Sequence, residues 1–138
     1  MANRIRKVEY FYCTVQDQPG ESYKILSTLA DVGINLLAFT AVPSGMQDTQ
    51  FTFFPEDPDK LKSEAKKAGL HVHGPIPALL VQGDDELGAL TEIHKKLYDY
   101  GVNVAASTAV TNGKGNFGYV IYIRTEQFEA AMAALGLS

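Results

Sequence analysis

The chain has 138 residues, of which 46% are hydrophobic and 20% are charged, and these are ordinary proportions for a globular protein. The net charge of -4 provides no basic field for a phosphate backbone, so nucleic acid is excluded as a partner. No apolar run reaches the roughly 20 residues that a membrane span needs, and the N-terminus lacks a signal-peptide core, so we expect a cytoplasmic protein without a membrane partner.

The sequence repeats itself at a spacing of 68 positions. When residues 17–42 are laid on residues 85–110 without a gap, 11 of the 26 positions are identical, among them Asp17/Asp85, Gly20/Gly88, Gly33/Gly101 and Asn35/Asn103. This period is longer than that of a solenoid repeat, so each copy is expected to be a small domain with its own core.

The first copy has the pattern of strand, helix, two hairpin strands, helix and strand. A β-branched and aromatic run leads into turn formers, a helical period ends at Gly33, and Asp57-Pro58-Asp59 signals a second helix that stops at Gly69. The expected strands are Val8–Val15, Ile34–Val42, Thr49–Phe54 and Leu70–His73, and the expected helices lie between them. Lys62, Lys66 and Lys67 are interpreted as the solvated face of the second helix.

The second copy repeats this order but stops after its second helix. The expected elements are strand Ala78–Gln82, helix Leu87–Tyr100, strand Val102–Thr111, strand Phe117–Arg124 and helix Glu126–Leu135. Without a fourth strand, one sheet edge stays open, and an open edge invites association with other chains. We therefore predict that a strand from the other half, or from a second chain, fills this edge.

These patterns predict an α+β fold. It would consist of two ferredoxin-like βαββαβ domains in tandem, at residues 1–75 and 76–138, with antiparallel sheets and the helices on one face of each sheet. Each half is near the lower size limit for independent folding, so the halves are expected to support each other.

The loop Asp17-Gln18-Pro19-Gly20, the helix after it and the entry Gly33-Ile34-Asn35 into the next strand resemble the opening of ACT domains. The second copy shows the same features at Asp85, Gly88 and Gly101-Val102-Asn103. The resemblance implies a tandem ACT protein, that is, a non-catalytic regulatory module that binds an amino acid near the seam between paired domains. It also implies a homo-oligomer, most simply a dimer, a metabolic enzyme as partner, and no cofactor.

The candidate ligand-binding residues follow from this resemblance and from their chemistry. Amide N–H groups at a helix N-terminus favour a carboxylate, glycine lets a backbone approach a ligand, and an aspartate or asparagine oxygen can accept from an ammonium group. The candidates are Asp17, Gln18, Pro19, Gly20 and Asn35 in the first copy, and Asp85, Glu86, Leu87, Gly88 and Asn103 in the second. The alternative interpretation is that these residues only form turns and helix ends.

The first copy is the better candidate site. In the second copy Leu87 replaces the loop proline, and three acidic residues stand side by side at positions 84–86, where they would repel a carboxylate. The near-identical pairs Ala38/Ala106, Thr40/Thr108 and Ala41/Ala109 lie in the strand that the resemblance places at the seam. Their similarity favours a contact between like surfaces, with common descent as the alternative explanation.

Two other classes of function stay open at this point. One is a small enzyme on the same sheet, although no nucleophile and base recur at matching places, and the other is a ligand-free protein-interaction module. His71 and His73 alternate along an expected strand, but no cysteine joins them, so no metal site is expected. Cys13 lies in an apolar strand pattern and is expected to be buried and inert.

Overall fold

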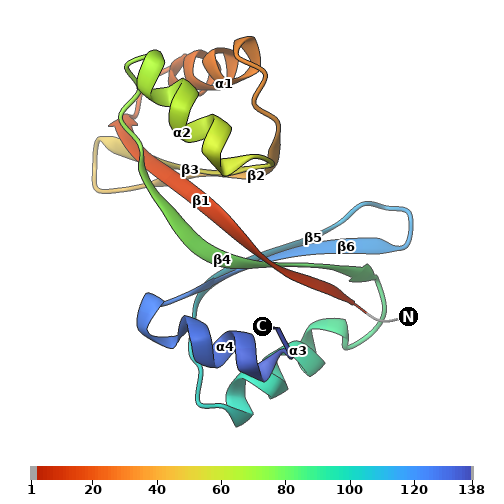
Figure 1. Cartoon of the computed structure of the whole chain (residues 1–138). Coiled ribbons are helices and arrows are strands. Elements are labelled where there is room, and N and C mark those ends of the chain that lie inside the picture. The colour runs from red at the N-terminus through yellow and green to blue at the C-terminus, as the bar shows by residue number, and fades with distance from the viewer. Residues whose placement is uncertain (1–2, 138) are drawn as a thin grey trace. The chain divides into compact units, whose positions relative to one another are not determined.

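The structure is a computed structural model that describes residues 3–137 (Figure 1). The strands are β1 (Arg4–Gln16), β2 (Leu36–Pro43), β3 (Asp48–Pro55), β4 (His73–Asp84), β5 (Val104–Thr111) and β6 (Asn116–Ile123). The helices are α1 (Glu21–Asp31), α2 (Pro58–Lys67), α3 (Ala89–Asp99) and α4 (Phe128–Ala134), with a short 3-10 turn, η1 (Thr125–Gln127), before α4. Within the described residues, no helix is long and apolar enough to cross a membrane.

The fold is α+β with antiparallel strands, as the sequence predicted. The strand order is β2-β3-β1-β4-β6-β5, and the chain divides into two compact units. One unit is Glu9–Ile76, and the other combines the chain up to Val8 with the chain from Pro77 onward. We call them the first and the second unit.

In the first unit, β3 lies between β2 and β1, with Phe53 opposite both Phe11 and Phe39. The helices α1 and α2 cover one face of these strands (Figure 1). The core forms between helices and sheet because alternate strand residues point to that face. It consists of Phe11, Cys13, Ile25, Leu29, Phe51, Phe53 and Leu61.

The second unit has the strand order β1-β4-β6-β5, to which β1 contributes its N-terminal residues. These residues occupy the place of the fourth strand that the second copy lacks. The prediction that a strand from the other half fills the open edge is therefore confirmed. The N-terminal residues of β1 also contribute to the hydrophobic core of the second unit, because Ile5 packs against the core formed by α3, α4 and the sheet.

One predicted pair of strands is a single strand in the structure. The expected strands Leu70–His73 and Ala78–Gln82 are replaced by β4, which begins at His73 and continues to Asp84. Pro75 and Pro77 lie between the two expected strands, and proline cannot donate a ladder hydrogen bond. Since they are two residues apart, their missing donors lie on the same side of the strand, and an extended strand accommodates both.

The role of the N-terminal segment in the second unit can be tested with Ile5→Ala. We expect a loss of about 1–2 kcal/mol in the free energy of unfolding, because a half-buried isoleucine loses apolar contact. Lys7→Ala, an exposed position of the same strand, is the control and should change stability by less than about 0.5 kcal/mol. Urea unfolding measures both, and equal effects would contradict the assignment of this segment to the core.

Cys13 is 4% exposed, as predicted for a buried thiol, and burial raises its pKa above the ordinary value of 9.0. Because the thiolate is the reactive form, we expect iodoacetamide to alkylate Cys13 much more slowly in the folded protein than in urea. The folded state also holds this proton more tightly, so the contribution of the thiol to stability is complete below pH 9 and declines above it. Rapid alkylation of Cys13 in the folded chain would contradict its burial.

Candidate functional site

The helices α1 and α3 both begin at a glycine in the left-handed backbone region. Gly20 has φ of 92° and Gly88 has φ of 79°, and neither helix start has a side-chain cap hydrogen bond. By contrast, α2 begins at Asp57, whose Oδ1 accepts a hydrogen bond from the Lys60 N–H at 3.2 Å. A left-handed conformation is strained for any residue with a Cβ, so glycine is required at these two starts. The Glu21 N–H donates to the Gln18 carbonyl, and the N–H groups of Ala89 and Thr91 donate to the carbonyls of Glu86 and Gly88. The first-turn donors that remain for an external acceptor are the N–H groups of Ser22, Tyr23 and Leu90.

A cavity of about 290 Å³ lies against the start of α1. Four of its lining residues come from the loop and the first helical turn, and the others come from the ends of β1, β2 and β3. They are Gln16, Asp17, Gln18, Glu21, Ser22, Ala41, Val42, Pro43, Thr49 and Phe51. The structure thus brings the predicted residues Asp17 and Gln18 to one cavity.

The second unit has a cavity of about 380 Å³ at the equivalent place, against the start of α3. Three predicted residues line it, and they are Asp85, Glu86 and Gly88. The remaining lining residues are Ala89, Leu90, Thr91, Ala109, Val110, Thr111 and Phe117. Asp85, Ala109 and Val110 are the counterparts of Asp17, Ala41 and Val42 at the spacing of 68, so the repeat reproduces the cavity as well as the loop.

The same backbone hydrogen bond holds both loops. The Asp17 N–H donates to the Gln47 carbonyl at 2.7 Å, and the Asp85 N–H donates to the Gly115 carbonyl at 2.8 Å. Both acceptors lie in the hairpin turn that follows the strand lining the cavity. This bond fixes each acidic side chain between a helix start and a hairpin.

Both loop cavities are acidic. Each has two carboxylate side chains in its lining and, among the described residues, no lysine or arginine. Glu21 lines the first cavity, and its Oε2 lies 3.2 Å from the Nζ of Lys24, which is outside the lining. That hydrogen bond, together with one from Gln18, lowers the pKa of Glu21, so this carboxyl group is charged at neutral pH. Such a cavity attracts an ammonium group, while the helix start offers N–H donors to a carboxylate.

The structure places Asn35 away from the loop cavity of its unit. It follows the C-terminal end of α1, and the 11 residues of that helix span about 16 Å. The Asn35 Nδ2 donates to Glu56 Oε2 at 3.1 Å, and the Asn35 carbonyl accepts from the Glu56 N–H at 2.8 Å. Asn35 therefore joins the exit of α1 to the segment before α2.

Asn103 occupies the corresponding place in the second unit, after the end of α3. Its backbone N–H donates to Gln127 Oε1 at 3.1 Å, and Gln127 Nε2 donates to the Gly101 carbonyl at 3.1 Å. Both asparagines are thus at helix exits rather than at helix starts, and the repeat brings them to equivalent structural positions.

Three other predicted residues lie beside the cavities rather than in their linings. Pro19 and Gly20 are exposed in the loop, and the Leu87 side chain is fully exposed. Sequence reasoning missed the hairpin ends that close the cavities, including Pro43 and Thr49. The sequence did contain a signal for them, because a short turn between the two strands brings Pro43 and Thr49 opposite each other in the β2–β3 hairpin.

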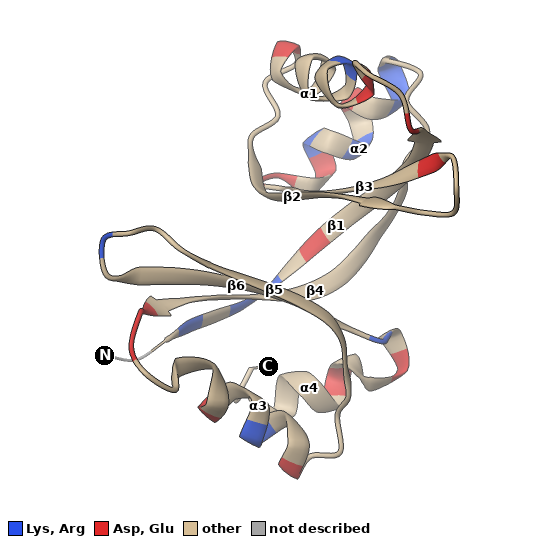
Figure 2. Ribbon diagram, turned by 180° about the vertical axis from the view of Figure 1, so that it is seen from behind, with Lys and Arg blue, Asp and Glu red and all other residues tan. Residues whose placement is uncertain are grey.

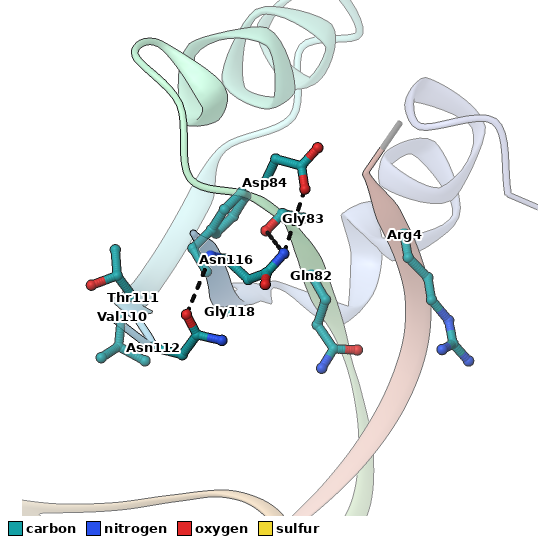
Figure 3. A pocket seen from close by; sticks show the side chains of 10 residues that line it. Arg4, Gln82, Gly83, Asp84, Val110, Thr111, Asn112, Asn116 and Gly118 are labelled. Carbon is teal, nitrogen blue, oxygen red and sulfur yellow. Dashed lines mark hydrogen bonds between the residues drawn. The ribbon is translucent and has the colours of Figure 1, made fainter. Parts of the chain in front are cut away.

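Another cavity, of about 500 Å³, lies in the second unit beside the β5–β6 turn (Figure 3). The Asn112 Oδ1 accepts from the N–H groups of Lys114 and Asn116, and Asn116 Nδ2 donates to the Gly83 carbonyl and to Asp84 Oδ1. These asparagines shape the hairpin turn. Arg4 and Gln82 also line the cavity, and none of these residues belongs to the predicted site.

The histidine pair does not form a metal centre in the part of the chain that the structure describes. There, no group of three or more metal-ligating side chains is present. His73 is the first residue of β4 and stacks on Tyr12 with ring centroids 5.0 Å apart. His71 lies before the strand, so the two side chains do not alternate along one strand as the sequence pattern suggested.

No protein-family profile and no curated protein sequence matches the chain. Solved structures do match. Protein BT0572 from Bacteroides thetaiotaomicron aligns with a TM-score of 0.81 and 17% identity, covering 96% of this chain and 88% of that chain. The regulatory subunit of aspartate kinase from Thermus thermophilus aligns with 0.62 and 18% identity, covering 97% and 94%.

The regulatory subunit of aspartate kinase from Thermus flavus aligns with a TM-score of 0.54 and 19% identity, covering 98% of this chain and 94% of that chain. At these identities the likeness concerns the fold. The chain therefore has a fold that is found in regulatory subunits of aspartate kinase, and the similarity extends over nearly its whole length.

The structural role of the helix exits can be tested with Gln127→Ala. Because this side chain makes two hydrogen bonds to the exit of α3, we expect its loss to lower the free energy of unfolding by about 1–2 kcal/mol. Asn103→Ala is the matched control, since the bond at that residue uses its backbone, and it should cost less than about 0.5 kcal/mol. A larger loss for Asn103→Ala than for Gln127→Ala, measured by urea unfolding, would contradict this account.

Proposed function

We propose that this protein is a regulatory module that binds a free amino acid in its loop cavities. The observation that carries the proposal is the recurrence, at the same spacing, of an uncapped helix start beside an acidic cavity. Two copies of one arrangement, each with N–H donors on one side and carboxylates on the other, fit a ligand that carries both a carboxylate and an ammonium group.

In the first unit, the ligand carboxylate would accept hydrogen bonds from the first-turn N–H groups of α1. The ammonium group would lie against Asp17, which faces the same cavity as Ser22. Its side chain would extend toward Ala41 and Val42 of β2. In the second unit, Asp85 and Glu86 would take the ammonium, and the larger cavity with Leu90 and Phe117 would accept a more apolar side chain.

The regulatory role rests on two supports. The chain shares its fold with two regulatory subunits of aspartate kinase. The hydroxyl groups that line the cavities, at Ser22, Thr49, Thr91 and Thr111, have no histidine beside them among the described lining residues, so the pairing of a hydroxyl nucleophile with a histidine base is missing there. We infer a sensor that acts on a metabolic enzyme by favouring one of two arrangements on binding its ligand.

We also propose that the protein acts as a homodimer in solution. β2 and β5 stand at the two ends of the strand order, so each has one edge that pairs with no other strand of the described chain. Val42 is 49% exposed and Val110 is 70% exposed on these strands. The repeated residues Ala38/Ala106 and Thr40/Thr108 lie there as well, and pairing with a second copy would cover these edges.

The amino-acid proposal is tested by thermal shift with the twenty amino acids, followed by calorimetry with any that stabilise the purified protein. Asp17→Asn should weaken the binding of that amino acid about tenfold or more, because a charge-assisted contact to the ammonium is lost. Asp31→Asn removes the same charge at the far end of α1, and Asn35→Ala alters the other predicted residue there. Both should leave the affinity within about twofold of the parent.

The outcomes separate cleanly. If no amino acid raises the unfolding midpoint, the proposed function is wrong. If one binds but Asp17→Asn and Asp31→Asn weaken it equally, the binding site is elsewhere than in the first loop cavity, and Asp85→Asn then tests the second.

A further inference from the structure

A third kind of cavity lies in the first unit, beside α2 and away from the loop. Its volume is about 280 Å³, which is at the small end of the range for ligand pockets. Its floor is apolar, because the half-buried Leu70 and Val72 line it and pack against the core, while Phe11 and Ala65, which are 1% and 2% exposed, close it. A cavity with such a floor favours the hydrocarbon part of a ligand.

The charged side chains around this floor are two lysines. Lys62 and Lys66 on α2 line the cavity together with His71, and no carboxylate is among the lining residues that the structure describes. This is unusual in a chain whose net charge is -4, and it is opposite to the acidic loop cavities. This cavity offers an anion two side-chain cations, whereas the loop cavities offer it only the N–H groups of the helix starts.

Lys62 and Lys66 stand four residues apart on one helix, where like charges repel and lower helix stability. Within residues 3–137, neither has an ion-pair partner, whereas their neighbour Lys67 lies 3.6 Å from Glu64. Lys66 and Lys67 both stand in the last helical turn, where a positive charge offsets the helix dipole. Only Lys66 of these two lines the cavity, so the dipole alone does not account for the pair Lys62 and Lys66.

The second unit provides an internal comparison. The hydrogen bonds that end α2 and α4 are equivalent at a spacing of 67 positions, since the Gly69 N–H donates to the Lys66 carbonyl and the Gly136 N–H to the Ala133 carbonyl. Lys62 and Lys66 therefore correspond to Glu129 and Ala133, and α4 has neither lysine nor arginine. The loop cavities recur in both units, whereas α4 carries no lysine pair at the place of Lys62 and Lys66. The charge pair is therefore not a requirement of the fold.

We propose that this cavity is a binding site for a small monocarboxylic acid with an apolar body. The carboxylate lies between the ammonium groups of Lys62 and Lys66, and the hydrocarbon part packs on the half-buried side chains of Leu70 and Val72. The site is separate from the loop cavities, so this proposal stands or falls independently of the amino-acid binding proposed above.

The test titrates the isotope-labelled full chain with four probes and follows backbone amide shifts. The probes are hexanoate, acetate, hexan-1-ol and hexylamine, which vary the charge and the apolar body one at a time. We expect hexanoate to shift the amides of Gly69, Leu70 and Val72, acetate and hexanol to bind about tenfold more weakly, and hexylamine to have no effect at these amides.

Matched variants identify the cations. The double variant Lys62→Gln/Lys66→Gln should weaken hexanoate binding about tenfold, while Lys67→Gln, on the same helix turn, should change it by less than about twofold. All three positions are exposed, so the variants should keep the amide spectrum of the parent, which the same measurement verifies. Lys66→Arg should retain binding.

The proposal is overturned if hexanoate causes no shift at these amides, or if hexanol binds as tightly as hexanoate. It is equally overturned if Lys67→Gln weakens binding as much as the double variant, because the effect would then belong to the general charge of α2.

Discussion

Hydrogen bonding along two long strands is the constraint on which both units depend. β1 gives its first residues to the second unit and its later ones to the first, and β4 is divided in the same way. The second unit is incomplete without the β1 segment that the first copy of the repeat encodes. For units of this size, which bury little apolar surface for their length, a missing strand would leave too small a core.

The repeated and the unrepeated parts of the chain carry different chemistry. The loop, the left-handed glycine, the hairpin contact and the helix exit recur at equal spacing, and they place acidic groups beside a free helix start in both units. The second helices differ, because α2 is highly charged and begins at the capping residue Asp57, whereas α4 is short and rich in alanine. The duplicated fold thus has two similar acidic cavities, whereas α2, which is not repeated in kind, places a pair of lysines beside a third cavity.

The sequence predicted most of the secondary structure and part of the candidate site. Period and turn chemistry located α1 and α3 closely, because their apolar stripes and terminal glycines are local signals. The continuity of β4 was not predictable in this way, since Pro75 and Pro77 are read locally as a break although the strand tolerates both. Asp17 and Asp85, predicted as ligand-binding residues, line cavities in the structure. Asn35 and Asn103 were grouped with them on the family resemblance and on their donor and acceptor chemistry, although the predicted helix already separates them from the loop.

The division of β1 also imposes an order in time. Its leading residues leave the ribosome first, yet their neighbour in the second unit starts at Pro77, 69 positions after Val8. During synthesis this stretch is an unpaired strand until Pro77 and the residues after it have been made, and unpaired strands readily join other chains. Arg4, Arg6 and Lys7 make it strongly basic, and charges of this kind are how natural sequences keep a nascent edge from aggregating.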